Sequence, residues 1–172
     1  MNVCQSQPPR LHIVGRRNAG KTSLICDLVR NLAGRGIRVA TIKHTHHHHE
    51  LDTPGKDSWK HREAGAVSVG ILSPHMIAAF MPSERGKSST DGYDRLDRMF
   101  YGSDLMLIEG DLHADGLKLE VWRPELNEPP YAATDTAIRA VISDVPVEIQ
   151  QEVWPRSDVA DLVDRILRVM DY

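Results

Sequence analysis

The chain contains Gly15-Arg16-Arg17-Asn18-Ala19-Gly20-Lys21-Thr22, in which two glycines are separated by four residues and followed directly by Lys-Thr. These residues fill every fixed position of a P-loop, the backbone turn that cradles phosphate groups. An apolar run at residues 11–14 precedes the turn and is typical of a buried strand, and a helical pattern with one apolar face follows it. This order predicts an anion site at the N-terminus of the first helix.

Each position of this turn has an expected role. Gly15 and Gly20 permit backbone conformations and a close approach that a Cβ atom would obstruct. Lys21 is expected to reach the β- and γ-phosphates of a nucleotide, and the Thr22 hydroxyl is expected to coordinate Mg²⁺. The alternative is a glycine turn that fits the pattern by coincidence. The residues predicted to surround the phosphates are Gly15, Asn18, Ala19, Gly20, Lys21, Thr22 and Ser23.

Length and composition limit the class of protein. A chain of 172 residues with a net charge of −3 suits a single domain, residues 1–172, and has no basic footprint for nucleic acid. Residues 1–10 are expected to form a flexible head. The sequence shows no secretory leader, no apolar stretch of the ~18 residues that cross a bilayer, and no disulfide framework. We therefore expect a cytoplasmic protein without nucleic-acid or membrane partners.

The remaining apolar patterns predict strands and helices in alternation. Strands are expected at 37–42, 105–108, 117–122 and 138–142, helices at 56–64, 91–100 and 158–170, and a β-hairpin from the runs 67–72 and 76–81. This alternation predicts an α/β fold. We expect a P-loop NTPase whose mainly parallel sheet is flanked by helices on both faces, with a small extra β-hairpin element.

Several polar residues directly follow apolar runs, where the carboxyl ends of parallel strands bind ligands. Glu109 is expected to hold Mg²⁺ directly or through water, and Gly110 to present its N–H near a γ-phosphate. The alternative for Glu109 is an ordinary strand-end glutamate. Asp144 is a candidate to accept two hydrogen bonds from guanine, although the Asn-Lys-x-Asp element of the common GTPases is absent.

A polar segment after residue 43 carries further candidates. The histidine run that includes His46 and His47 is interpreted either as a site for Zn²⁺ or Ni²⁺ or as a solvated loop without a ligand. Asp52 is a candidate catalytic residue that would orient water or Mg²⁺. The alternative for this turn is that Asp57 or Ser58 caps the helix that follows.

Two arginines and three tryptophans complete the candidates. Arg16 and Arg17 lie inside the phosphate turn, where they would stabilise phosphate charge, project into a partner subunit or simply face solvent. The tryptophans, Trp59, Trp122 and Trp154, are expected to pack in the fold rather than to stack on a base.

Taken in order, these motifs resemble the molybdopterin-guanine dinucleotide biosynthesis protein B (MobB) family. A Lys-His-x-His-His block followed by Asp-x-Pro-Gly-Lys-Asp-Ser is more specific than the P-loop alone. The resemblance extends over residues 11–170, and its matching segments are 15–22, 35–39, 42–47, 52–58, 64–66, 107–110 and 142–144.

The resemblance implies a GTP-binding accessory protein with at most weak GTPase activity, whose ligands are GTP and Mg²⁺. It would assist a MobA-like molybdenum cofactor guanylyltransferase that joins GMP to molybdopterin. It also implies a homodimer formed with the help of an extra β-element, for which residues 67–81 are the candidate. Carried over by position, the phosphate and Mg²⁺ ligands are Gly15, Gly20, Lys21 and Thr22, and Glu109 lies near the metal; the candidate catalytic residues are Lys21, Glu109 and Asp52.

The chain departs from the family pattern at several positions. Arg16, Arg17 and Ala19 stand where the family usually has small or hydroxyl residues, and Asp111 stands where an aromatic residue is common. This extra charge bears on the hydrolysis rate and the nucleotide preference. Two other functions stay open at this point, a His-rich metallochaperone GTPase and a small-molecule P-loop kinase, whose lid signal at residues 85–87 is weak.

Overall fold

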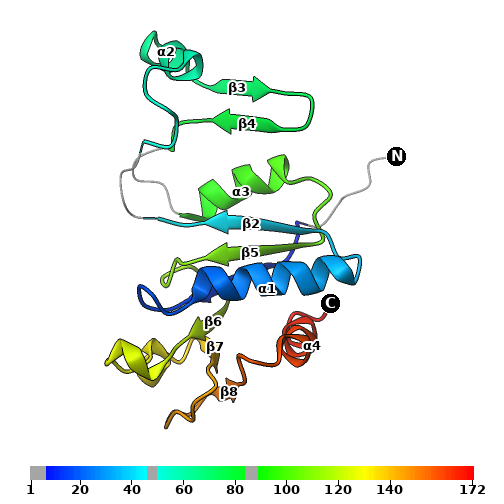
Figure 1. Ribbon diagram of the computed structural model, residues 1–172, viewed down its shortest axis with the longest axis vertical. Helices are drawn as coiled ribbons and strands as arrows, with labels where there is room; N and C mark the ends of the chain where they lie inside the picture. Colours follow the sequence, from blue (N-terminus) through cyan, green and yellow to red (C-terminus); the bar gives the residue numbers. More distant parts are fainter. Residues whose placement is uncertain (1–6, 46–49, 84–88) are drawn as a thin grey trace. The chain divides into compact units, whose positions relative to one another are not determined.

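The computed structural model describes residues 7–45, 50–83 and 89–172. In these ranges the chain forms two compact units, the first of residues 7–45 and 94–172 and the second of residues 50–83 and 89–93. Helix α3 (Ser89–Met99) contributes to both units. Figure 1 shows the elements of each unit in sequence colours. The single domain expected over residues 1–172 stays a prediction.

The first unit is built on a parallel sheet whose described strands follow the order β2-β5-β1-β6-β7-β8 (Figure 1). All neighbouring pairs in this sheet are parallel. Strand β1 therefore lies inside the sheet, with β5 on one side and β6 on the other. The strands are β1 (Arg10–Val14), β2 (Val39–Lys43), β5 (Leu105–Glu109), β6 (Leu117–Val121), β7 (Ile138–Ile142) and β8 (Glu152–Trp154). The predicted α/β fold with a parallel sheet is confirmed.

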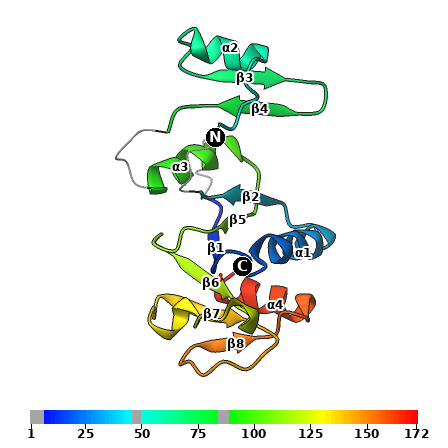
Figure 2. The same cartoon turned by 60° about the vertical axis from the view of Figure 1, so that its left-hand side comes forward.

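One face of this sheet carries the main apolar core. Helices α1 (Lys21–Gly34) and α4 (Val159–Val169) both contribute to this core (Figure 2). Alternate strand residues point to the same face, so Leu11 and Ile13 of β1 join Leu107 of β5 in contact with the helices. The core holds α1 against the sheet, which fixes the position of the turn before it.

The other face of the sheet is more polar than the sequence pattern suggested. Arg10 donates to the carboxylates of Asp94, at 2.6 Å, and of Asp97 on α3. The fully buried carboxylate of Glu120 on β6 accepts from the backbone N–H groups of Tyr131 and Ala132 at 2.8 and 2.9 Å. Burial raises the pKa of Glu120. Charged side chains thus hold the end of α3 and the loop after β6 in place.

The second unit contains helix α2 (Asp57–Glu63) and an antiparallel hairpin of β3 (Val69–Leu72) and β4 (Ile77–Phe80). The hairpin closes between Ser73 and Met76, where the Ser73 N–H donates to the Met76 carbonyl at 2.9 Å. The expected hairpin is therefore confirmed. The hairpin leaves several large apolar side chains exposed, and such side chains often mark a surface that contacts another protein.

Several strand boundaries lie one or two residues from the predicted ones, and one described strand was not predicted. The strand expected at residues 37–42 begins at Val39, because the Arg38 N–H is already bonded to the Asp104 carboxylate at 2.8 Å. Strand β8 was not predicted. It is only three residues long, and its one buried side chain is Trp154, so the period-2 pattern that marks a strand is too short to detect. The burial of Trp154 confirms its predicted packing role.

Candidate nucleotide site

The turn between β1 and α1 depends on its two glycines. Gly15 has a φ angle of +139°, and a Cβ atom there would lie 2.5 Å from the Val121 carbonyl oxygen of β6. Gly20 has a φ angle of +100° and forms the N-cap of α1. Side chains at these φ values are strained, and the backbone of β6 cannot give way at 2.5 Å. The sheet itself therefore requires glycine at position 15.

The helix begins directly after this turn. The Leu24 N–H donates to the Gly20 carbonyl at 3.0 Å, which starts the helical bonding pattern. The N–H groups of the first helical turn, at Lys21, Thr22 and Ser23, have no acceptor within the helix itself. Together with the positive end of the helix dipole, they favour an anion here. The predicted residues thus lie on one continuous segment that runs from the turn into the first residues of α1: Gly15, Asn18, Ala19, Gly20, Lys21, Thr22 and Ser23.

Lys21 folds back over the turn. Its Nζ donates to the carbonyls of Gly15 and Arg16 at 2.8 and 2.7 Å. Burial lowers the pKa of this ammonium group. Both acceptors are neutral carbonyls, whereas a phosphate carries a negative charge that attracts the ammonium group directly. A phosphate entering the turn would therefore compete effectively for Lys21.

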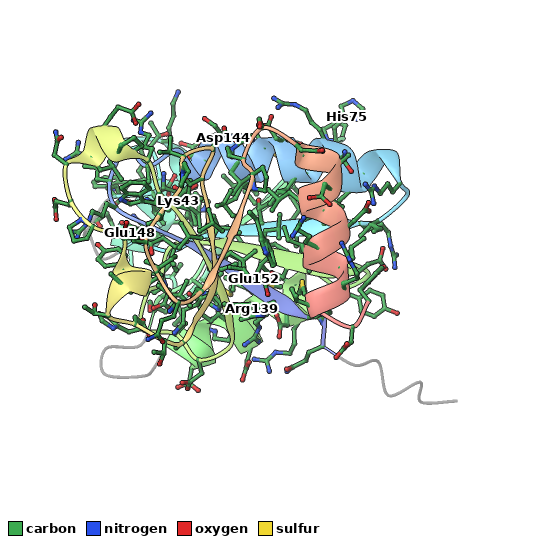
Figure 3. All side chains as sticks on the ribbon, turned by 90° about the horizontal axis from the view of Figure 1, so that it is seen from below. Lys43, His75, Arg139, Asp144, Glu148 and Glu152 are labelled. Atoms are coloured by element: carbon green, nitrogen blue, oxygen red, sulfur yellow. The ribbon has the colours of Figure 1, made fainter. Side chains whose placement is uncertain are left out.

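Thr22 and Glu109 lie next to each other at the carboxyl edge of the sheet. The Thr22 hydroxyl lies 3.0 and 2.9 Å from the two carboxylate oxygens of Glu109. The Lys43 Nζ is 3.8 Å from the same carboxylate, because the parallel register places Lys43 opposite Glu109. Figure 3 labels Lys43. A hydroxyl and a carboxylate side by side are hard oxygen ligands of the kind Mg²⁺ takes together with nucleotide phosphates.

Gly110 and its neighbours close the end of β5. The Gly110 N–H donates to the Ile13 carbonyl at 2.9 Å, so a γ-phosphate would have to replace this bond to receive the N–H as predicted. A Cβ atom at Gly110 would lie 3.3 Å from the His44 carbonyl oxygen. The His44 Nδ1 is 3.5 Å from the buried carboxylate of Asp111. Asp111 stands at the position where the family resemblance led us to expect an aromatic residue.

Asp144 lies at the carboxyl end of β7, as predicted, and its side chain is labelled in Figure 3. Its Oδ1 accepts from the Ser157 N–H at 2.8 Å, in the segment that leads into α4. This backbone hydrogen bond lowers the pKa of Asp144. The carboxylate is exposed and charged, and it ties the end of β7 to the start of α4.

Arg16 does not simply face solvent. Its guanidinium donates to the Pro129 carbonyl at 3.3 Å, pairs with Glu128 at 2.5 Å and lies over the Tyr131 ring at 4.6 Å from its centroid. Arg17, in contrast, is exposed. Sequence reasoning missed the role of Arg16, because its partners lie more than a hundred positions away and carry no motif.

Asp52 belongs to the second unit, where it organises the turn before α2. Its buried Oδ1 accepts from the Thr53 N–H at 2.8 Å and from the Ser58 hydroxyl at 2.9 Å. The suggestion that Asp57 or Ser58 caps α2 is wrong. The N-cap is Lys56, which makes no side-chain cap bond, and the Ser58 hydroxyl is directed to Asp52 instead. The catalytic role of Asp52 stays a prediction.

The proposed histidine site falls on residues that the structure does not describe. His46 and His47 lie outside the described ranges. Among residues 7–45, 50–83 and 89–172, no three or more His, Cys, Asp or Glu side chains are grouped so that they could hold a metal. In the same part of the chain, no helix is long and apolar enough to cross a membrane.

Comparison with known proteins identifies the family of the chain. The family model described as molybdopterin guanine dinucleotide synthesis protein B matches residues 10–144. The chain is 33% identical to the molybdopterin-guanine dinucleotide biosynthesis adapter protein of Escherichia coli K12 over 170 residues, covering 94% of this chain and 93% of that protein. It is 32% identical to the adapter protein of the same name from Haemophilus influenzae over 161 residues, covering 94% and 89%.

Solved structures give the same result. A crystal structure titled molybdopterin-guanine biosynthesis protein B aligns at 30% identity with a TM-score of 0.68 and covers 95% of this chain and 99% of that one. The Bacillus subtilis MobB structure, at 23% identity and a TM-score of 0.71 over 93% and 96% of the two chains, shares the fold. The chain belongs to the molybdopterin guanine dinucleotide synthesis protein B family.

Proposed function

We propose that this chain binds GTP with Mg²⁺ at residues 15–23 and acts as an adapter in the formation of molybdopterin guanine dinucleotide. The observation that carries the proposal is the Thr22–Glu109 pair, which places a hydroxyl and a carboxylate within 3.0 Å at the N-terminus of α1. Lys21 beside them supplies the positive charge for the β- and γ-phosphates. Glu109 orients Mg²⁺ in this assignment.

The adapter role follows from the relatives, which are named as adapter proteins of this biosynthesis. We infer a nucleotidyltransferase of the MobA type as the partner and molybdopterin as the group that receives GMP. Any GTPase activity belongs to the same site and is weak, with Lys21 and Glu109 as its catalytic residues. We also propose that the protein acts in the cytoplasm.

We also infer a homodimer through the hairpin of the second unit. Several of its large apolar side chains are exposed, among them Leu72 at 81%, Ile77 at 75% and Met76 at 71%. Exposed apolar patches of this kind mark interaction sites in otherwise polar proteins. Leu72→Lys with Ile77→Lys should convert the dimer to a monomer in analytical ultracentrifugation. The exposed pair Thr136→Lys and Ala137→Lys is the control and should leave the dimer intact.

The experiment that tests the main proposal is a competitive titration of GTP, GDP, ATP and ADP, each with Mg²⁺ and with EDTA. GTP should bind more tightly than ATP, and EDTA should weaken the binding. Lys21→Ala should abolish binding while the circular dichroism spectrum stays unchanged. Equal affinity of a folded Lys21→Ala protein for GTP would refute the phosphate site, and a preference for ATP would refute the choice of guanine.

A further inference from the structure

A hollow of about 470 Å³ lies in the first unit, beside the short 3₁₀-helix η2 (Tyr131–Ala133). The residues that line it come from two stretches of the chain, 132–136 and 148–151. Most of their side chains are polar. The hollow is large enough to hold a small molecule or the end of a long side chain, and none of its lining residues belongs to the predicted nucleotide site.

This hollow lies at the edge of the sheet that is opposite to the phosphate turn. Thr136 comes shortly before the start of β7, and Gln151 directly precedes the start of β8. Strands β1, β6, β7 and β8 are all parallel, and the phosphate turn follows the end of β1. A ligand at the starts of β7 and β8 would therefore leave the predicted nucleotide site free.

The charge of the hollow is negative and uncompensated. Glu148 is the charged side chain of its lining, and within the described residues this exposed carboxylate makes no ion pair or hydrogen bond. Asp135 lies between two lining residues and adds a second negative charge. Arg139 of β7 does not line the hollow, and its guanidinium donates to Glu152 at 2.7 Å (Figure 3). The hollow therefore favours a cationic ligand.

Gln151 supplies a second feature that favours a hydrogen-bond donor. Its Nε2 donates to the Asp135 carbonyl at 3.3 Å, which sets the orientation of the amide. Its Oε1 is buried and accepts no hydrogen bond from the residues that the structure describes. A buried acceptor without a donor costs free energy, so a ligand that donates here would be stabilised. The lining thus offers a carboxylate and an amide oxygen, both of them acceptors.

We propose that this hollow receives an arginine side chain of another protein. A guanidinium group carries a planar set of N–H donors and no acceptor, so it can bond Glu148 and Gln151 together, which the compact ammonium of lysine does less well. Ala132 and Ile149 provide apolar surface for the methylene stem of the arginine. The rim is exposed at Ala133, Thr134 and Gln150, so a side chain can enter from outside. This docking site does not depend on the proposed nucleotide function.

The test is an NMR titration of the isotope-labelled full chain with N-acetyl-arginine amide. The same compound made with citrulline, which has nearly the same shape and no charge, is the control probe. The arginine probe should shift the backbone amide signals of Thr134, Ile149 and Gln151 in a saturable way, and citrulline should bind about two- to fivefold more weakly or not at all. Glu148→Gln should weaken arginine binding by about two- to fivefold, whereas Glu125→Gln, at an exposed glutamate outside the hollow, should not.

Two rim variants test the sign of the charge effect. Gln150→Glu adds a carboxylate and should tighten binding of the arginine probe, and Thr136→Lys supplies a cation of its own and should weaken it.

Three results would overturn the proposal: equal binding of the citrulline probe, an unchanged affinity in Glu148→Gln, or shifts that map outside the hollow. Tighter binding of free arginine than of the blocked amide would also overturn it, because it would assign the hollow to a small molecule rather than to a protein side chain. GTP added to the titration should leave the arginine affinity unchanged. Failure of the proposed function is distinguishable, since it appears as loss of GTP binding in the wild type and does not affect the arginine titration.

Discussion

The guanidinium carbon of Arg16 lies 4.6 Å from the centroid of the Tyr131 ring, which joins the phosphate turn to the loop after β6. The same loop is held by Glu120, whose carboxylate accepts hydrogen bonds from the backbone N–H groups of Tyr131 and Ala132. The turn that is expected to hold phosphates and the loop on the predicted base side are thus one connected structure. A substitution in the phosphate turn should therefore change the stability of the loop, and a substitution in the loop should affect the turn.

Replacing Arg16 should loosen that loop. A cation–π contact of this kind contributes about 0.5–1 kcal/mol, so Arg16→Ala should raise amide exchange at Tyr131 and Ala132 by roughly two- to fivefold. Hydrogen–deuterium exchange with mass spectrometry measures this directly. Arg17→Ala, at the exposed neighbouring position, is the control and should leave these amides unchanged. Equal exchange in the two variants would mean that Arg16 does not hold the loop.

Gly15→Ala should destabilise the fold as well as the site. The new Cβ would meet the Val121 carbonyl oxygen at 2.5 Å, and the positive φ angle adds strain, for a cost of roughly 1–3 kcal/mol or more. Thermal unfolding followed by circular dichroism should show a lower melting temperature. Gly34→Ala is the matched control, because a Cβ there meets no atom within 4 Å and alanine is favoured in a helix by up to about 1 kcal/mol. An unchanged melting temperature for Gly15→Ala would contradict the close approach.

Glu109→Gln keeps the shape of the side chain and its hydrogen bond to Thr22 but removes the charge. If Glu109 helps to hold Mg²⁺, the gain in GTP affinity that Mg²⁺ provides should fall by about tenfold or more, while binding in EDTA changes little. Isothermal titration calorimetry with Mg²⁺ and with EDTA measures the GTP affinity with and without the metal and so isolates the gain that Mg²⁺ provides. Glu152→Gln, at an exposed glutamate on β8, should behave like wild type. Identical Mg²⁺ dependence in both variants would make Glu109 a structural residue.

The ion pair of Asp104 with Arg38 should make the stability of the fold depend on pH in the acid range. Hydrogen bonds from Arg38 lower the pKa of Asp104 from 3.8 to about 2. A carboxyl with a lowered folded-state pKa contributes stability that is present above its unfolded value and is lost as the pH falls toward the folded value. The melting temperature of wild type should exceed that of Asp104→Asn at pH 5, and the difference should shrink as the pH falls below about 4.

The control for this series is Asp115→Asn, at an exposed position. Its melting temperature should follow that of wild type over the same pH range. A difference between wild type and Asp104→Asn that stays constant down to pH 3 would show that the charge of Asp104 does not stabilise the fold.

Much of the candidate site could be predicted from the sequence because the patterns that indicate it are local. The P-loop is a contiguous motif, and Glu109 and Asp144 each follow an apolar strand whose period can be read directly. The contacts that escaped prediction are those between distant segments. Arg16 reaches the loop at Pro129, a contact that only the completed sheet creates. The Ser58–Asp52 bond was missed for another reason, since a serine at a helix start is usually interpreted as its cap.

The contact between Gly15 and the backbone of Val121 also bears on how the protein is made. Strand β1 and the whole phosphate motif leave the ribosome early, but both neighbours of β1 in the sheet come from the region after residue 104. Until β5 has been synthesised, Thr22 lacks its partner Glu109, which lies 87 positions further along the chain, and until β6 has been synthesised, Gly15 lacks its neighbour Val121. We therefore expect a nascent chain that stops before Leu105 to carry the complete motif without either neighbour of β1, so that the predicted nucleotide site is completed only after β5 and β6 have been made.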